Sequence, residues 1–305
     1  MIDYDPHSWR SHLFDIRGSM AKEILVRVAI FTVWTVGVVA VHYWTPFDLS
    51  FPPTVHQLVG VALGLLLVFR TNSSYDRFWE GRKLWGGIVN ESRNLARQAS
   101  VHLIADENLR NKLVLGTIAF AYASMHSLRR KTLAADSREL LGRLGGHLSR
   151  EEFERLAAAE HLPIAIAAWL TSQLRTARDQ GHLSDIVLTT LDQNVQLLVD
   201  YLGGCERIHK TPIPYAYMVH VRRALILYCG SLPFSLVKDF GWETVPVVVL
   251  LTYVFLGIEE IGVEIEDPFG EDDNDLPLER ICGTIERNLL EIIGLPREQE
   301  NSLAE

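Results

Sequence analysis

Residues 28–47 constrain the fold more than any other part of this 305-residue chain, because twenty consecutive positions contain no Asp, Glu, Lys or Arg. An α-helix of that length extends about 30 Å, which matches the hydrocarbon core of a bilayer. Tyr43 and Trp44 lie near the end of the stretch and have the amphipathic rings that favour the lipid–water boundary. The stretch therefore predicts a transmembrane helix.

A second uncharged stretch covers residues 49–69. Proline is tolerated in the first turn of a helix but not in its interior, so Pro52 and Pro53 set the helix start near Thr54. The charged residues that follow do not interrupt the helical pattern. We therefore predict one long helix over 54–100 that leaves the membrane midway.

Two shorter uncharged runs, 224–237 and 244–258, are each ambiguous between a buried core helix and a membrane span. As an antiparallel pair joined by D-F-G-W they predict a transmembrane hairpin. Long basic side chains at its ends can snorkel to the interface and so lengthen it, and Arg222, Arg223 and Lys238 are placed to do this.

The flanking charge predicts the orientation of the spans. Lys and Arg precede the first span and follow the second, whereas the connection at 45–53 has neither. Because basic residues favour the cytoplasmic side, we expect both termini in the cytoplasm of a multi-pass protein of the plasma (inner) membrane. Four crossings keep the termini on the same side.

The rest of the chain has a helical pattern without sustained strand alternation. Further helices are expected at 109–131, 137–144, 150–159, 165–179 and 184–208. Ser149 and Glu152 have the spacing of a capping box, and Gly145-Gly146, Pro163 and Gly181 separate the other helices. The expected fold is all-α: four transmembrane helices and a helical cytoplasmic layer. The expected segments are a cytoplasmic N-terminal segment (1–23), the first two spans (24–100), a cytoplasmic region (101–212), the hairpin (213–262) and an acidic loop with a C-terminal helix (263–305).

Charge and motifs exclude several classes of protein. The 29 Lys and Arg against 38 Asp and Glu give a net charge of −9, which argues against a nucleic-acid partner. The three cysteines form no C-x-x-C pair, and none of the eleven histidines pairs with another at i,i+4. The sequence contains no H-E-x-x-H, G-x-S-x-G, Walker or G-x-G-x-x-G motif, so we do not expect an enzyme.

Val61, Leu65 and Phe69 recur every four residues, so they share one helix face over about 12 Å. Gly60 and Gly64 lie on nearby faces and would let neighbouring helices approach closely. The spacing alone leaves two interpretations open. The commoner one is a packing or lipid-facing stripe; the other is a set of apolar rings that gate a pore by dewetting in a symmetric oligomer.

The acidity of the chain belongs to one segment. Residues 259–275 hold nine acidic residues and no Lys or Arg, so the rest of the chain is balanced. Such a run is usually a solvated surface, and this one lacks the EF-hand pattern. Calcium nevertheless takes six to eight oxygen ligands, which carboxylates after a Pro-Phe-Gly turn can supply.

Several motifs, in order along residues 16–290, resemble those of the bestrophin family, especially its bacterial members. They are I-R-G-S (16–19), F-R-T-N-S-S-Y-D-R-F-W-E-G-R-K-L-W-G (69–86), L-G-G-C-E-R (202–207), T-P-I-P-Y-A-Y (211–217) and I-E-D-P-F-G-E-D-D-N-D-L-P-L (265–278). The resemblance implies a homopentameric ion channel assembled as a ring in the lipid bilayer. It also implies that anions such as chloride are favoured among the permeant ions.

The resemblance further implies roles for individual residues. Val61, Leu65 and Phe69 would form the pore neck, and Ile186 a second, cytoplasmic aperture. In animal members the acidic segment binds calcium. The corresponding side-chain ligands here are Asp272 and Asp275, the backbone carbonyl ligands are Glu264 and Asp267, and a further carbonyl falls within 2–4.

Two alternatives stay open at this point. One is a monovalent-cation channel of the same fold, since an apolar neck discriminates poorly by the sign of charge. The other is a membrane-anchored helical scaffold or sensor, which would explain the cytoplasmic helices but not the stripe at Val61, Leu65 and Phe69.

Overall fold

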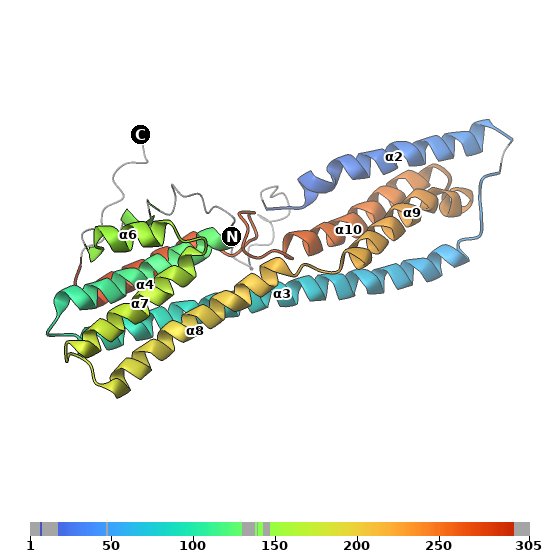
Figure 1. Cartoon of the computed structure of the whole chain (residues 1–305). Coiled ribbons are helices and arrows are strands. Elements are labelled where there is room, and N and C mark those ends of the chain that lie inside the picture. Colours follow the sequence, from blue (N-terminus) through green and yellow to red (C-terminus); the bar gives the residue numbers. More distant parts are fainter. Residues whose placement is uncertain are drawn as a thin grey trace, which may run out of the picture. The chain divides into compact units, whose positions relative to one another are not determined.

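The computed structural model describes residues 7, 18–46, 48–129, 138, 140–142 and 147–295. Within these residues every regular element is helical (Figure 1). The chain divides into two compact units. Unit 1 comprises 1–79, 211–268 and 272–275, and unit 2 comprises 80–210, 269–271 and 276–305.

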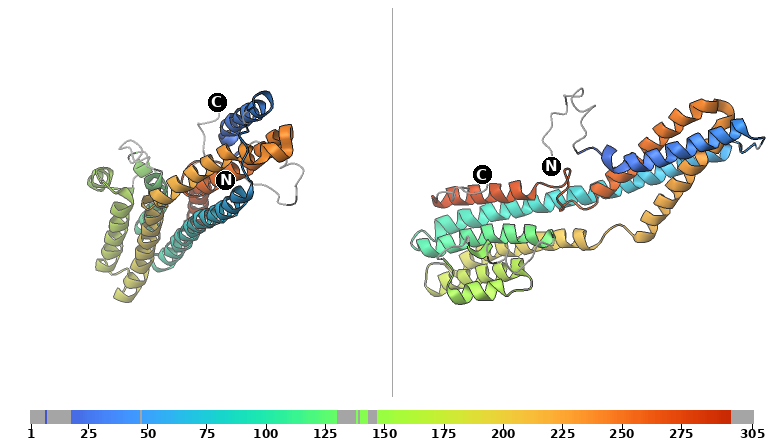
Figure 2. Two further views of the ribbon diagram at one scale, coloured as in Figure 1. Left: turned by 90° about the vertical axis from the view of Figure 1, so that its right-hand side faces the viewer. Right: turned by 90° about the horizontal axis from the view of Figure 1, so that it is seen from above.

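Unit 1 contains α2 (Ala21–Trp44), the first part of α3 (Thr54–His102), α9 (Tyr215–Phe240) and α10 (Thr244–Glu264). The 3₁₀ turn η2 (Gly241–Glu243) joins α9 to α10. Helix α2 packs against both α10 and α9, and the blue and orange ribbons of Figure 2 lie together in both views. Within the described residues, three helical segments are long and apolar enough to cross a membrane: 21–44, 54–102 and 215–264. The last contains two helices, so the expected hairpin is present.

The predicted long helix is confirmed almost to the residue, since α3 begins at Thr54 and ends at His102. The hairpin helices extend beyond the predicted uncharged runs. Helix α9 begins at Tyr215, directly after Pro214, and so includes Arg222 and Arg223, which bounded the uncharged run. The first predicted span ended at Phe47, which lies outside the described residues, and α2 ends at Trp44.

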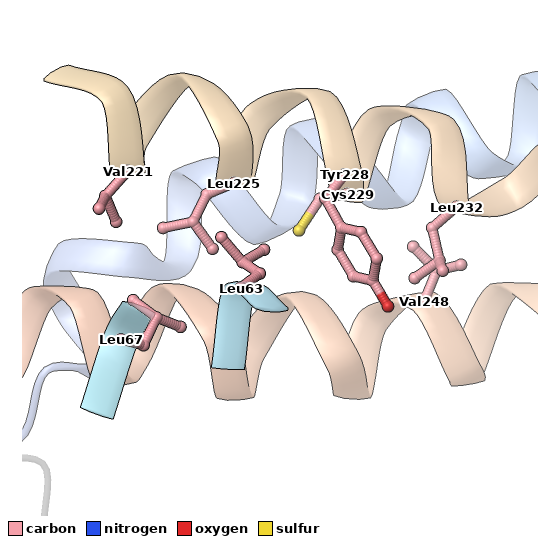
Figure 3. Packing of buried hydrophobic residues seen from close by; sticks show 8 residues of the cluster. All are labelled: Leu63, Leu67, Val221, Leu225, Tyr228, Cys229, Leu232 and Val248. Carbon is pink, nitrogen blue, oxygen red and sulfur yellow. The ribbon is translucent and has the colours of Figure 1, made fainter. Parts of the chain in front are cut away.

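The core of unit 1 forms where α3 meets α9. Leu63 and Leu67 on α3 are buried against side chains of α9 and against Val248 of α10 (Figure 3). The α9 side chains of this cluster are Val221, Leu225, Tyr228, Cys229 and Leu232. A Cβ atom at Gly60 would lie 2.7 Å from the Tyr228 hydroxyl oxygen, so a larger residue there would have to displace the Tyr228 side chain.

Unit 2 contains the rest of α3 with α4 (Glu107–Leu128), α6 (Arg150–Ala157), α7 (Leu162–Asp179), α8 (Asp185–Lys210) and α11 (Leu278–Ile293). Helix α4 packs against α7, α8 and α11 and is buried along most of its length. Gly116 makes the contact with α7 possible, because a Cβ there would lie 2.5 Å from the Trp169 ring.

The helix boundaries of unit 2 follow the predicted caps. Ser149 caps α6 while the Glu152 side chain accepts from the Ser149 N–H, which confirms the capping box. Pro163 does not precede α7 as predicted but lies in its first turn, where a missing N–H costs nothing. Of the predicted helix at 137–144, residues 138 and 140–142 are described and are helical; its other residues and Gly145-Gly146 lie outside the described residues.

Candidate functional site

The apolar stripe, Val61, Leu65 and Phe69, lies outside the core of unit 1. Their exposed fractions are 76%, 55% and 56%, respectively. The buried residues of the same helix, Leu63 and Leu67, point to the opposite side against α9. Helix α3 therefore uses one face for packing within the chain and leaves a second apolar face uncovered.

The two glycines beside the stripe have different surroundings. Gly60 accommodates Tyr228 of the same chain, as described above. Gly64 has no atom within 4 Å of a Cβ built at that position. Gly64 is thus the glycine whose open surface is available to a neighbouring molecule.

Arg70 directly follows the stripe but points into unit 1, where it is only 1% exposed. Its Nη2 lies 3.2 Å from the Glu266 carboxylate, while Nε and Nη1 have no hydrogen-bond partner within the described part of the chain. Glu266 also accepts from the Ile213 N–H at 2.9 Å, and its carbonyl oxygen accepts from Arg77 Nε at 3.0 Å. Glu266, which follows α10, therefore contacts α3 at both Arg70 and Arg77, beyond the stripe.

Two further ion pairs connect the helices of unit 1. Arg222 on α9 donates to Glu259, which is buried on α10, at 2.9 Å. Arg27 on α2 donates to Glu260 at 2.5 Å. In the sequence these glutamates belong to one acidic run, which does not show that they bind different partners. The only hint of these pairs in the sequence was that Arg27 and Arg222 lie in the more polar part of the otherwise apolar helices α2 and α9.

Ile186, the predicted second aperture, belongs to unit 2. It is the second residue of α8 and is 80% exposed. The preceding residue, Asp185, accepts from Arg178 Nε at 2.8 Å, which fixes the start of the helix. The Ile186 side chain is thus largely uncovered within its own unit, and its role stays a prediction.

The predicted calcium residues lie together at the end of unit 1. Asp275 is buried, and its carboxylate accepts from the Asp272 N–H at 2.8 Å, which closes a tight turn. Asn274 bridges the turn to the carboxylate of Glu264, to which its side chain donates at 3.0 Å. The same amide donates to the Gly18 carbonyl oxygen at 3.1 Å.

The electrostatics of this acidic loop favour a cation. The pKa of Asp275 is raised to about 7. Burial is the largest cause, and the nearby negative charges of Asp272, Asp267 and Glu264 add to it. A bound cation would offset that cost by compensating the buried negative charge. Within the described residues, however, no three His, Cys, Asp or Glu side chains converge as a metal site. The residues suit an oxygen-ligated ion that takes backbone carbonyls as well as Asp272 and Asp275.

The sequence profile described as "Bacterial/Fungal Bestrophin protein" matches residues 1–291. This chain belongs to the bestrophin family. A voltage-dependent anion channel-forming protein of Synechocystis is 40% identical over 295 residues, covering 95% of this chain and 94% of that protein. The corresponding Escherichia coli K12 protein, YneE, is 34% identical over 297 residues, covering 96% and 94%.

Solved structures give the same assignment. A crystal structure of a bacterial bestrophin homologue from Klebsiella pneumoniae superposes with a TM-score of 0.83 at 33% sequence identity. The match covers 90% of this chain and 100% of that chain. Family membership and the apolar helices of the described residues indicate a membrane protein, and the relatives that it matches are named as channel-forming proteins.

Proposed function

We propose that five copies of this chain form an ion channel, with the first part of α3 from each copy around a central axis. The observation that carries the proposal is the stripe of Val61, Leu65 and Phe69, which is exposed while the opposite face of α3 forms the core. In a ring, each stripe residue becomes an apolar constriction that gates by dewetting. Ile186 forms a second aperture at the cytoplasmic end of the pathway.

The channel lies in the plasma (inner) membrane with both termini in the cytoplasm. Basic residues on either side of the first two spans support this orientation. The names of the relatives support permeation by anions such as chloride. A monovalent-cation channel is the first alternative, since the stripe carries no charge, and a membrane-anchored scaffold is the second.

Ion flux through purified protein in liposomes tests the channel. The Val61→Ala, Leu65→Ala, Phe69→Ala triple variant should conduct more than the wild type, because each ring loses five large side chains. The matched control is Leu25→Ala, Ile30→Ala, Val33→Ala on α2, whose apolar side chains are similarly exposed. Equal flux from both triple variants at equal incorporation would contradict the pore assignment, and absence of flux in the wild type would favour the scaffold.

The oligomeric state is tested separately. The mass of the protein in mild detergent should correspond to five chains of 34.5 kDa. Gly64→Leu places a large side chain on the open glycine of α3 and should weaken the assembly, since small residues permit close approach of helices. A monomer or dimer as the largest wild-type species would exclude the pentamer.

We also propose that the acidic loop binds calcium through Asp272 and Asp275 with carbonyl oxygens of Glu264 and Asp267. The buried Asp275 carboxylate, with its raised pKa, supports this. A ligand that binds only the folded state adds about 2.7 kcal/mol of stability at a hundredfold excess over Kd. Calcium should therefore raise the melting temperature, magnesium should raise it less, and Asp272→Ala with Asp275→Ala should remove the rise. An identical melting temperature with calcium and with a chelator would mean that the acidic segment is only a solvated loop.

A further inference from the structure

Asp76 is the first charged residue beyond Phe69 on the same face of α3. Seven residues in an α-helix return to within about 20° of the starting direction and advance about 10 Å along the axis. Asn72 and Ser73 on the intervening turn are exposed and uncharged, and the Ser73 hydroxyl donates to the Phe69 carbonyl oxygen. The direction of the apolar stripe therefore leads first to the carboxylate of Asp76.

The carboxylate of Asp76 is not neutralised within the chain. It is exposed, and it has no hydrogen bond or ion pair within the described part of the structure. The nearby basic residues on α3 point elsewhere: Arg70 to the Glu266 carboxylate, and Arg77 to the carbonyl oxygens of Glu266 and Thr211. The part of α3 that belongs to unit 1 thus directs both of its arginines to partners within that unit and leaves one anion on the uncovered face.

The stripe itself cannot supply selectivity for the sign of charge. Apolar rings carry no fixed charge, so they neither attract nor repel an ion by its sign, and the barrier that they raise is one of dehydration. Discrimination must then come from fixed charges next to the constriction, where walls of low dielectric constant strengthen the field. Among the α3 residues that follow Phe69 in unit 1, Asp76 alone combines exposure, charge and the direction of the stripe.

We propose that Asp76 is a specificity-determining residue: five copies form a ring of carboxylates on the cytoplasmic side of the neck, which raises cation permeability relative to anion permeability and so opposes the anion preference proposed above. This inference rests on the proposed pentameric channel, because only a ring brings five copies around one ion path. The field of the ring attracts cations to the cytoplasmic end of the neck and lowers the local anion concentration. It acts most strongly within about 8 Å at physiological ionic strength, which is the screening length there.

The test measures the reversal potential of the purified channel in planar bilayers under a tenfold KCl gradient. Asp76→Asn should lower the ratio of potassium to chloride permeability by about threefold or more, and Asp76→Lys should lower it further. Asp76→Glu keeps the charge and should keep the wild-type ratio. The matched control is Glu23→Gln, which removes an exposed acid from α2, a helix packed on α10 and α9.

The dependence on salt separates an electrostatic effect from a steric one. The difference between wild type and Asp76→Asn should shrink at 1 M KCl, where the screening length falls to about 3 Å. An unchanged permeability ratio in both Asp76→Asn and Asp76→Lys, with currents intact, overturns the role of Asp76 and leaves the channel standing. Absence of current from wild-type protein overturns the channel itself, and the inference with it.

Discussion

Units 1 and 2 place their apolar and charged side chains in opposite ways. Most of the large apolar residues that the structure exposes belong to unit 1, for example Trp44 and Val33 on α2. Among the described residues, the three buried charged residues, Arg70, Glu259 and Asp275, also belong to unit 1, although the Arg129 side chain of unit 2, which is paired with Glu279, is only 6% exposed. The buried polar residues of unit 2, such as Gln173, are uncharged, and its Trp169 is enclosed by neighbouring helices.

This difference shows which surroundings each unit is built for. In water, exposed apolar area costs free energy and charge belongs at the surface, as in unit 2. In a bilayer the hydrocarbon solvates apolar side chains, and ionisable groups turn inward to find partners, as in unit 1. Three experiments test whether the two units differ in this way.

The largest effect is expected from the ion pair of Arg70. Glu266→Ala leaves the buried guanidinium without its carboxylate, so the free energy of unfolding in mild detergent should fall by about 3–5 kcal/mol. The control is Glu80→Ala in unit 2, which removes an exposed partner of Arg207 and should cost about 1 kcal/mol or less. Equal losses from the two variants would mean that burial does not distinguish the pairs.

The second prediction introduces the same charge into each unit. Ile30 on α2 and Ile104 after α3 are 62% and 77% exposed. Ile30→Asp should reduce membrane insertion of α2 by about 3 kcal/mol, the cost of an aspartate within a span. Ile104→Asp should change the stability of the protein by about 0.5 kcal/mol or less, as for a residue facing water. Equal tolerance of both substitutions, measured by an insertion assay and thermal melting, would argue against lipid contact at Ile30.

The smallest effect concerns pH. The pKa of Asp275 is about 7 in the folded protein, above its ordinary value near 3.8, so the folded state binds the proton more tightly than the unfolded state. Without calcium, stability should therefore fall as pH rises from 5 to 7, by at most about 1.4 kcal/mol per pH unit, and level off above 7. Asp275→Asn keeps an acceptor for the Asp272 N–H and should remove this slope. A wild-type slope that persists in the variant would have to come from other groups.

Sequence patterns predicted those parts of the fold that depend on neighbouring residues. The start of α3 after Pro53 and the capping box at Ser149 are local, since a few adjacent residues decide them. The stripe was also visible, because its spacing of four belongs to one helix. That it is exposed, whereas Leu63 and Leu67 are buried, depends on how α9 packs and could not be predicted from α3 alone.

The contacts that hold unit 1 together depend on distant residues. Glu259 and Glu266 look alike in an acidic run, yet one binds Arg222 and the other Arg70. Neither partner follows from periodicity or composition, because the fold brings these segments together. For the same reason the sequence alone could not show that Arg70 and Arg77, the basic neighbours of Asp76, contact Glu266 and not Asp76.

The pairing of Arg70 with Glu266 also constrains how such a chain can evolve. The two residues are 196 positions apart, and losing either one leaves the other charge unpaired in a buried site. Substitution at one position should be accepted only together with substitution at the other, so aligned relatives should show the two positions changing jointly. A chimera that joins the N-terminal half of one relative to the C-terminal half of another should fold only where both parents carry the same pair.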